Sequence, residues 1–381
     1  MKKILINFIL FALSGCSVNS IISNSPAQTK IKPISISHNI NAIALSSISS
    51  LSTIIPQLAR YKAVLVGESH TTYGDHLNQL AIIKNLYRHW GKMAIGLEFV
   101  QYPYQQALDD YIAGKITEKQ MLHQTHWYDR WRYDFRLYRP IFNYAKQQQI
   151  PLVALNTPRE ITKRISEVGI EGLTAKERAQ LPKIIDDSNA DYKKSLEKVY
   201  SQHGGKSHSK KFARFYQAQL AWDETMADQV AKFMQKHPNT RLVVLAGSGH
   251  IKNRYGIPSR LERRIKSKVA VVLNDLEDNP TPLLADYVLF SPDIELPKAG
   301  KMGIFMQDTP KGVLISKIMK NSASAKAGLK KGDFILALNG EKVKTVEEIK
   351  INMMEAKPKQ KVELLVRGIG QQKISKTMIL Q

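Results

Sequence analysis

Residues 62–72 of this chain are Lys-Ala-Val-Leu-Val-Gly-Glu-Ser-His-Thr-Thr, and this stretch decides the fold. The apolar run 63–66 is short and ends at a glycine, which is typical of a buried β-strand. The polar residues 68–72 then predict a turn. After this turn apolar side chains recur at helical spacing, which predicts a helix from His76 onward that buries Leu77, Leu80, Ile82, Ile83 and Leu86.

The same alternation of apolar runs and helical segments continues along the chain. Helical periodicity covers residues 130–149 and 212–236. Apolar strands that alternate with helices predict an α/β fold with a mainly parallel sheet, flanked by helices on both faces. The four further strands are predicted at 94–97, 151–155, 242–246 and 269–273.

Polar residues follow four of these strands directly. They are Glu68 with His70, then Glu98, Asn156 and His250. The carboxyl ends of parallel strands meet at one rim of a sheet, where active crevices lie, so we expect these side chains to gather. Such a set suits a divalent metal site, acid and base catalysis, or hydrogen bonds that orient loops.

Aromatic residues form a second theme. Trp127, Trp131 and Phe135 recur four residues apart, which predicts one buried helical face. Tyrosine and histidine also ligate iron in haem proteins, so Tyr73 and His76, close to His70, are candidates for that role.

Composition restricts the partners. Lys and Arg total 56 against 33 Asp and Glu, a formal net charge of +23 that attracts anions. The basic residues are scattered, without zinc-finger spacing or a basic helix flanked by heptads, so no nucleic acid is expected. The single cysteine, Cys16, excludes an internal disulfide and a multi-cysteine metal site.

The N-terminus predicts a secretion signal at residues 1–15. Lys2 and Lys3 precede a short apolar run, too short to span a membrane. Leu13-Ser14-Gly15-Cys16 resembles the bacterial lipobox, which implies cleavage before Cys16 and its acylation, for example by palmitate. Acyl chains anchor a protein stably, and Ser17 favours the outer membrane, facing the periplasm. Residues 16–52 predict a tether.

Residues 53–290 resemble the ChaN family of iron-regulated haem-binding lipoproteins, related to erythromycin esterases. No single motif is decisive, but the order and number of the matches are specific. The matching stretches are Gly67-Glu68-Ser69-His70, Gly96-Leu97-Glu98-Phe99, Tyr138-Arg139-Pro140, Asn156-Thr157-Pro158-Arg159-Glu160, Asp223-Glu224-Thr225-Met226-Ala227, Gly247-Ser248-Gly249-His250-Ile251 and Gly256-Ile257-Pro258.

The resemblance implies a haem carrier in iron acquisition rather than an enzyme. It implies a haem pocket shared across a homodimer and a tyrosine iron ligand, for which Tyr73 is the first choice. The other residues expected to bind haem are His70, His76, Tyr138, Arg139 and His250. The wider superfamily, with erythromycin esterases and Tiki-type metalloproteases, implies an alternative: a metal-dependent hydrolase that uses Glu68, His70, Glu98 and His250.

Residues 291–381 begin with a proline-containing linker and then resemble a bacterial PDZ domain, a small α+β fold. The resemblance rests on Ala327-Gly328-Leu329, Gly332-Asp333-Phe334-Ile335 and Asn339-Gly340. Such domains add an extended peptide as a strand to a sheet edge and hold its carboxylate with backbone N–H groups. The resemblance implies docking of an envelope protein's peptide, with Lys301, Met302, Gly303 and Ile304 as the carboxylate-binding loop.

Overall fold

The computed structural model describes residues 45–202, 204, 209–275, 280–368 and 372–381. The predicted signal sequence, Cys16 and most of the predicted tether lie outside these residues. Among the described residues, no helix has both the length and the apolar character needed to cross a membrane.

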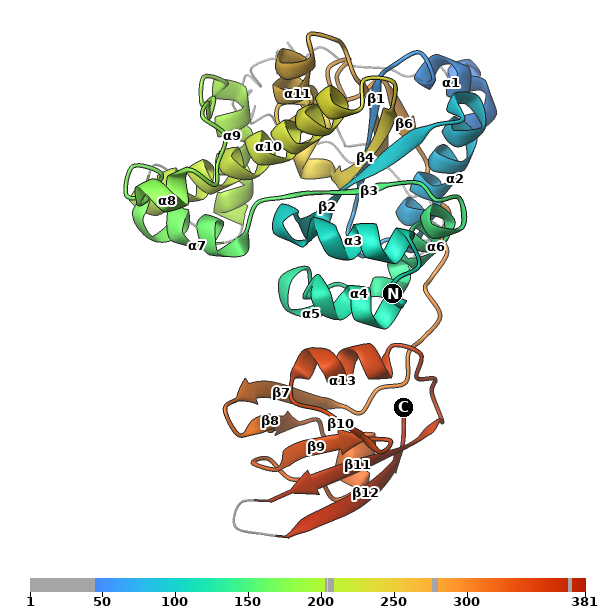
Figure 1. Ribbon diagram of the computed structural model, residues 1–381, viewed down its shortest axis with the longest axis vertical. Helices are drawn as coiled ribbons and strands as arrows, with labels where there is room; N and C mark the ends of the chain where they lie inside the picture. The colour runs from blue at the N-terminus through green and yellow to red at the C-terminus, as the bar shows by residue number, and fades with distance from the viewer. Residues whose placement is uncertain (1–44, 203, 205–208, 276–279, 369–371) are drawn as a thin grey trace, which may run out of the picture. The chain divides into compact units, whose positions relative to one another are not determined.

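The first sheet is parallel throughout and has the order β3-β2-β4-β1-β5-β6 (Figure 1). This confirms the predicted α/β class. The sequence did not indicate β6, which has only three residues. The strands are β1 (Ala63–Glu68), β2 (Met93–Gln101), β3 (Leu152–Asn156), β4 (Arg241–Gly247), β5 (Ala270–Asn274) and β6 (Tyr287–Leu289).

Both faces of this sheet are covered because side chains alternate along each strand. In β1, Val64 and Val66 point into one apolar core, while Ala63 and Leu65 point into the other. The first core is shared with α1 (Leu51–Leu58), α2 (Tyr73–Trp90), α3 (Gln105–Ile112) and α6 (Arg139–Gln147). The second is shared with α10 (Lys210–Lys236) and α11 (Ile257–Ile265).

The helix predicted over residues 130–149 is wrong in its first half. The chain there forms short pieces, because Arg132 has a φ of 75° that no right-handed helix accepts. Trp127 and Phe135 are fully buried but Trp131 is only half-buried, so the three do not share one helical face. The pieces are α4 (Glu118–Gln124), α5 (Trp127–Arg130) and η3 (Phe135–Leu137), followed by α6.

The α/β region contains seven further short or peripheral helices among the described residues. They are η1 (Leu45–Ser47), η2 (Tyr102–Tyr104), α7 (Arg159–Val168), α8 (Ala175–Arg178), α9 (Ala190–Gln202), η4 (Ser248–His250) and η5 (Lys252–Arg254).

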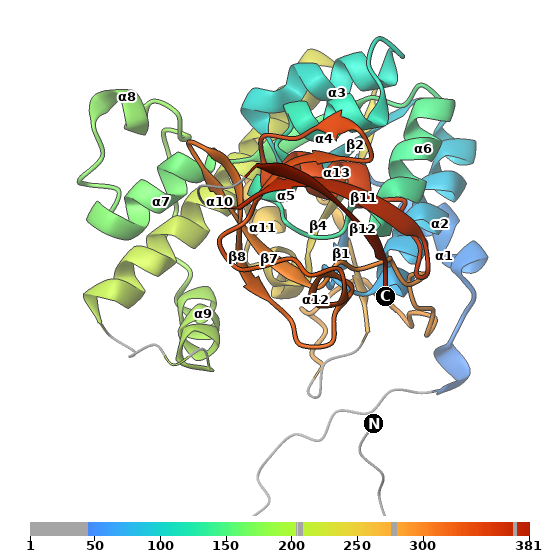
Figure 2. The same ribbon diagram turned by 90° about the horizontal axis from the view of Figure 1, so that it is seen from below.

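The second sheet is antiparallel and has the order β12-β11-β9-β8-β7, with β10 paired to β9 (Figures 1 and 2). Its core contains Val313, Ile335, Ile349 and Leu364. This sheet with its two helices is the small α+β fold predicted for the C-terminal region. The elements are β7 (Ile304–Thr309), β8 (Gly312–Ile318), α12 (Ala323–Lys326), β9 (Phe334–Leu338), β10 (Glu341–Lys342), α13 (Val346–Met353), β11 (Lys361–Arg367) and β12 (Lys373–Ile379).

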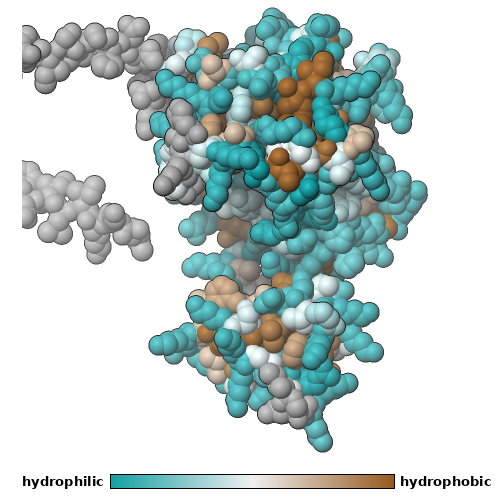
Figure 3. Space-filling view, turned by 90° about the vertical axis from the view of Figure 1, so that its left-hand side faces the viewer, coloured by the Kyte–Doolittle hydropathy of each residue, from teal (hydrophilic) through white to brown (hydrophobic). Residues whose placement is uncertain are grey.

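Hydrophilic residues cover most of the face shown in Figure 3, and one ionic cluster lies inside the protein. Glu224 of α10 is fully buried. Its carboxylate lies 3.2 Å from Arg260 Nε and accepts hydrogen bonds from Arg263 (2.8 Å) and Arg264 (2.5 Å), all on α11. The cluster therefore joins α10 to α11 on the face of the sheet that they cover.

We expect Glu224→Ala to lower the free energy of unfolding of the α/β region by about 3–5 kcal/mol, because it leaves buried Arg260 without its carboxylate. All four tryptophans lie between residues 90 and 222, so urea unfolding followed by tryptophan fluorescence reports on this region. Glu167→Ala is the matched control, since its pair with Arg164 is half exposed; it should cost at most about 1 kcal/mol. Equal losses in the two variants would contradict a structural role for the cluster.

Candidate functional site

The structure brings Glu68, His70, Glu98 and His250 together at the carboxyl ends of the central strands. Glu68 is the last residue of β1 and is paired in register with Gly247, the last residue of β4. His70 and His250 follow these two strands, while Glu98 lies within β2. Asn156 is not part of this group: its side chain accepts a hydrogen bond from the backbone of Thr157 next to it.

Glu68 and His70 form the first carboxylate–imidazole pair. His70 Nδ1 lies 2.6 Å from Glu68 Oε1, and the Glu68 side chain is fully buried. Burial alone would lower the pKa of His70, but the hydrogen bond and charge of Glu68, helped by Glu98, raise it. The other carboxylate oxygen of Glu68 is buried, has no hydrogen-bond partner among the described residues and lies 3.9 Å from His76 Nε2.

His250 lies between two carboxylates. Its Nδ1 is 2.7 Å from Asp223 Oδ1, and its Nε2 is 3.4 Å from Glu98 Oε1. Glu98 also accepts a hydrogen bond from the backbone N–H of Gly247 at 2.5 Å. Tyr192 of α9 donates to the second oxygen of Asp223, also at 2.5 Å.

The charges in this group support one another. Burial alone would lower the pKa of His250, but the negative charges of Glu98 and Asp223 raise it well above its usual value. Burial would raise the pKa of Glu98, but the charge of His250 and its hydrogen bond lower it. The raised pKa of His250 and the lowered pKa of Glu98 both favour the charged form of this pair.

The sequence places Asp223 in one of the matching motifs but gives it no role in the predicted site. It lies in the middle of α10 and is fully buried. Acidic residues are almost never fully buried without a partner, so an acidic residue among the buried positions of a predicted helix was the signal that pointed to it.

Aromatic rings enclose His70. Trp131 lies 4.8 Å and Tyr133 4.9 Å from its ring, measured between centroids. Burial, together with the charges of Glu68 and Glu98, raises the pKa of Tyr133. Aromatic rings thus surround His70, while its carboxylate partners are charged. Charges in such surroundings interact more strongly with a ligand.

The four rim residues pair with one another instead of converging on a point. Among the residues that the structure describes, no group of three or more His, Cys, Asp or Glu side chains is arranged to hold a metal ion. The metal-ligand interpretation of the rim, and with it the metal dependence of the predicted hydrolase, therefore lacks a ligand set. All four rim residues remain candidates for acid and base catalysis.

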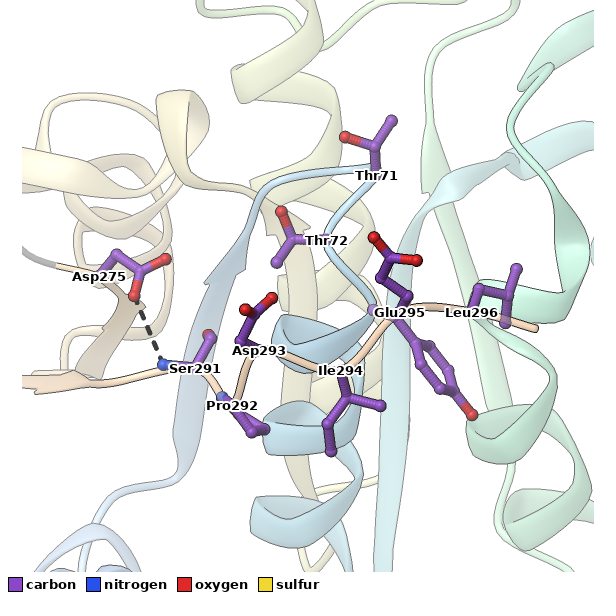
Figure 4. Close-up of a pocket in the computed structure, with 10 residues that line it drawn as sticks. Thr71, Thr72, Asp275, Ser291, Pro292, Asp293, Ile294, Glu295 and Leu296 are labelled. Carbon is purple, nitrogen blue, oxygen red and sulfur yellow. Dashed lines mark hydrogen bonds between the residues drawn. The ribbon is translucent and has the colours of Figure 1, made fainter. Parts of the chain in front are cut away.

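Tyr73 lies beside this group, at the first position of α2. It is half-buried and lines a cavity of about 440 Å³, together with Thr71, Thr72, Asp275 and residues 291–296 (Figure 4). No described residue forms a hydrogen bond with the Tyr73 hydroxyl. Ser291 ties the wall of the cavity to α2, because its hydroxyl donates to Asp75 at 2.5 Å, and Asp75 also accepts from Ser69 N–H at 2.7 Å.

Three of the residues expected to bind haem are engaged inside the protein. His76 and Tyr138 are buried, and each contacts the carbonyl oxygen of His70 at 3.4 Å. Arg139 makes a two-pronged hydrogen-bonded pair with Glu118 at 2.9 and 3.0 Å. His76 and Tyr138 thus hold the loop that carries His70, whereas Arg139 holds α4 through Glu118.

The predicted carboxylate-binding loop precedes β7. Lys301 is not available there, because its N–H donates to the carbonyl of Gln381 at 2.8 Å. The carbonyls of Met302 and Gly303 accept from Ser324 and Met319, whereas no described residue accepts from their N–H groups. Gly303 has a φ of 74°, and a Cβ there would lie 2.3 Å from the Ser322 Cβ, so glycine is required.

The fold and the rim define a two-part protein: a parallel α/β domain with a buried histidine–carboxylate site, followed by a peptide-docking type of fold. Residues 54–261 match the family described as "Haem-binding uptake, Tiki superfamily, ChaN", and residues 300–373 match the PDZ domain. Because the first match covers more than half of the chain, the chain belongs to the ChaN haem-binding uptake family. The predicted resemblance is confirmed.

A solved structure, "Cofacial heme binding to ChaN of Campylobacter jejuni", shares the fold with a TM-score of 0.52 and 20% identity, covering 64% of this chain and 92% of that one. Protein RETICULATA-RELATED 5 of Arabidopsis thaliana is 23% identical over 256 residues, 57% of this chain and 32% of that protein. Periplasmic endoprotease DegQ of Escherichia coli is 37% identical over 60 residues, 16% of this chain and 13% of that protein. The chain thus spans about a third or less of these curated relatives.

We expect His250 to stay protonated through neutral pH. A raised pKa means that the pair stabilises the fold fully below the unfolded pKa of about 6.5, and that this stability is lost as pH rises through the folded pKa. NMR titration of the His250 Cε1–H resonance, assigned with a His250→Gln variant, tests this. Asp223→Asn should lower the titration midpoint, whereas Asp228→Asn on the same helix should not. A wild-type midpoint near 6.5 would contradict the prediction.

Proposed function

We propose that this chain is a haem-binding lipoprotein of the bacterial envelope that takes part in haem or iron acquisition and docks a partner through its PDZ domain. One observation carries the proposal. A member of a haem-binding family presents a tyrosine, Tyr73, three residues after His70 of the rim; its hydroxyl has no partner among the described residues, and it lines a cavity.

The residues fit a haem iron. Tyrosine oxygen and histidine nitrogen are both haem ligands. No described residue forms a hydrogen bond with the Tyr73 hydroxyl or with the Nε2 of His70, three residues earlier, whose Nδ1 is engaged by Glu68. His76, Tyr138 and Arg139 do not take part as ligands in this proposal.

The cavity lining does not fit haem propionates. Asp275, Asp293 and Glu295 line it, and no Lys or Arg does. Carboxylates repel carboxylates, so the propionates of a haem bound at Tyr73 would lie outside this cavity. Such a haem would be shared between two copies of the chain, as the family resemblance implies. The cofacial haem binding named for the Campylobacter jejuni protein supports the same arrangement.

The location is proposed from the sequence. Cys16 in the lipobox would carry the acyl chains, and the chain would face the periplasm from the outer membrane. The match to part of DegQ, which is a periplasmic protein, supports a location of this PDZ domain in the periplasm.

Haem titration of the full chain in detergent, followed by absorbance, tests the proposal. We expect saturable binding with a phenolate-type ferric spectrum. Tyr73→Phe should remove that spectrum and weaken binding about tenfold or more, a loss of at least about 1.4 kcal/mol. Tyr87→Phe on the same helix is the control and should bind as the wild type does. Binding that does not saturate would sink the proposal, and an unchanged spectrum in Tyr73→Phe would sink its ligand.

A second candidate function is metal-free hydrolysis at the rim. It is favoured by the pairing of two histidines with separate carboxylates, Glu68 with His70 and Asp223 with His250. In such a reaction His70 Nε2 takes a proton from water, whose oxygen forms a bond to the substrate carbonyl carbon. Protonated His250 gives its proton to the leaving oxygen as the bond from that oxygen to carbon breaks.

Hydrolysis of a nitrophenyl ester by the full chain tests this candidate. Because the pKa of His70 is raised, the rate should increase with pH as His70 loses its proton. His70→Ala should lower the rate by about 10²–10⁴-fold, while a chelator should leave it unchanged. Loss of activity with the chelator, restored by a divalent cation, would contradict the metal-free reaction. A wild-type rate equal to that of His70→Ala would contradict hydrolysis at this site.

A further inference from the structure

Strand β7 is an edge strand with one side free. Among the described strands it pairs with β8 alone, so its other side can accept a further strand. Its side chains alternate: Ile304 and Met306 are half-buried against the core, whereas Phe305 is 52% exposed. A large aromatic ring exposed at a free edge is a contact surface for whatever pairs there.

The loop before β7 sets the direction of an added peptide. The free N–H groups of Met302 and Gly303 can hold a terminal carboxylate, because their carbonyls are tied down by Ser324 and Met319. A peptide fixed there by its C-terminus runs antiparallel to β7. Since side chains alternate, its last residue faces the core side with Ile304, and its penultimate residue shares the outer face with Phe305.

That outer face is positively charged next to Phe305. Phe305 is opposite Lys317 in the β7–β8 ladder, and Lys317 Nζ lies 5.5 Å from the ring centre. Lys301 directly precedes the loop residues Met302 and Gly303. Lys320 directly follows Met319, whose N–H donates to the Gly303 carbonyl. Residues 300–381 contain 16 Lys and Arg against 7 Asp and Glu, so the domain as a whole is positively charged, as is the surface beside Phe305.

The acidic residues close to β7 do not offset this charge. Asp308, at the far end of β7, accepts a hydrogen bond from Val346 N–H at 2.7 Å and so caps α13. Glu348 accepts from the N–H groups of Lys344 and Thr345 at the same helix start. Both are therefore committed to the start of α13, away from the loop.

A PDZ fold already implies an extended peptide with a free C-terminus and an apolar last residue. We infer that the partner of this edge also carries acidic residues at the penultimate and fourth-from-last positions. The apolar residue meets the half-buried side chains of Ile304, Met306 and Met353. The acidic residues lie on the outer face, beside Phe305 and Lys317. The inference rests on the proposed peptide docking and specifies its ligand.

Fluorescence anisotropy with labelled ten-residue peptides and the full chain in detergent tests this inference. The first peptide ends in Glu-Thr-Glu-Val with a free carboxylate. Matched peptides carry Gln or Lys in place of both Glu residues, and a fourth carries a C-terminal amide. We expect the Glu peptide to bind about threefold or more tightly than the Gln peptide and to lose this advantage at high salt.

Lysine variants assign the effect. Lys317→Gln should remove most of the preference for Glu over Gln while the Gln peptide binds as before. Lys373→Gln, at the opposite edge of the same sheet on β12, is the control and should keep the preference. Equal binding of the Glu, Gln and Lys peptides would overturn the inference and leave peptide docking intact. No binding of any peptide, or equal binding of the amide, would overturn the docking itself.

Discussion

The parallel pairing of β1 with β4 is the constraint on which the rest of the site depends. It sets Glu68 opposite Gly247, so the segments that carry His70 and His250 leave the sheet at the same end. A slip of one residue would turn Glu68 to the other face of the sheet, which fixes this register strongly. Gly247 lets the segments meet, because a Cβ at that position would lie 2.8 Å from His70 Cε1. The backbone register therefore brings the imidazoles and carboxylates to the same end of the sheet.

The electrostatic balance of the site follows from that assembly. Three carboxylates, those of Glu68, Glu98 and Asp223, are buried within it, and each would be costly without a partner. His250 compensates two of them, and its own raised pKa is the consequence. The hydroxyl of Tyr192 on α9 completes the shell of Asp223, so a helix far along the chain from β1 helps to fix the histidine. The site is thus coupled to the packing of α9 and α10 as well as to the sheet.

The sequence predicted those parts of the structure that local patterns determine. Five of the six strands of the parallel sheet and α10 were expected, because apolar runs and helical periodicity are properties of neighbouring residues. The rim of Glu68, His70, Glu98 and His250 followed from the parallel topology. The break at Arg132 and the burial of Tyr138 were not predictable, since they depend on how the aromatic residues of α5, η3 and α6 pack in three dimensions. Nor did the sequence show that the rim residues pair instead of converging on a metal, because this depends on ångström-scale side-chain geometry.

The loop between β1 and α2 bears on both proposed functions and is held rigidly. Ser69 N–H donates to Asp75, Thr72 N–H donates to the Ser69 carbonyl, and the His70 carbonyl contacts His76 and Tyr138. These contacts hold the backbone on either side of His70 and directly before Tyr73. Catalysis requires His70 Nε2 to face water, whereas iron ligation would occupy that same atom. A haem held by both residues therefore excludes hydrolysis, and a haem held by Tyr73 alone leaves the histidine–carboxylate pairs as the scaffold that positions its ligand.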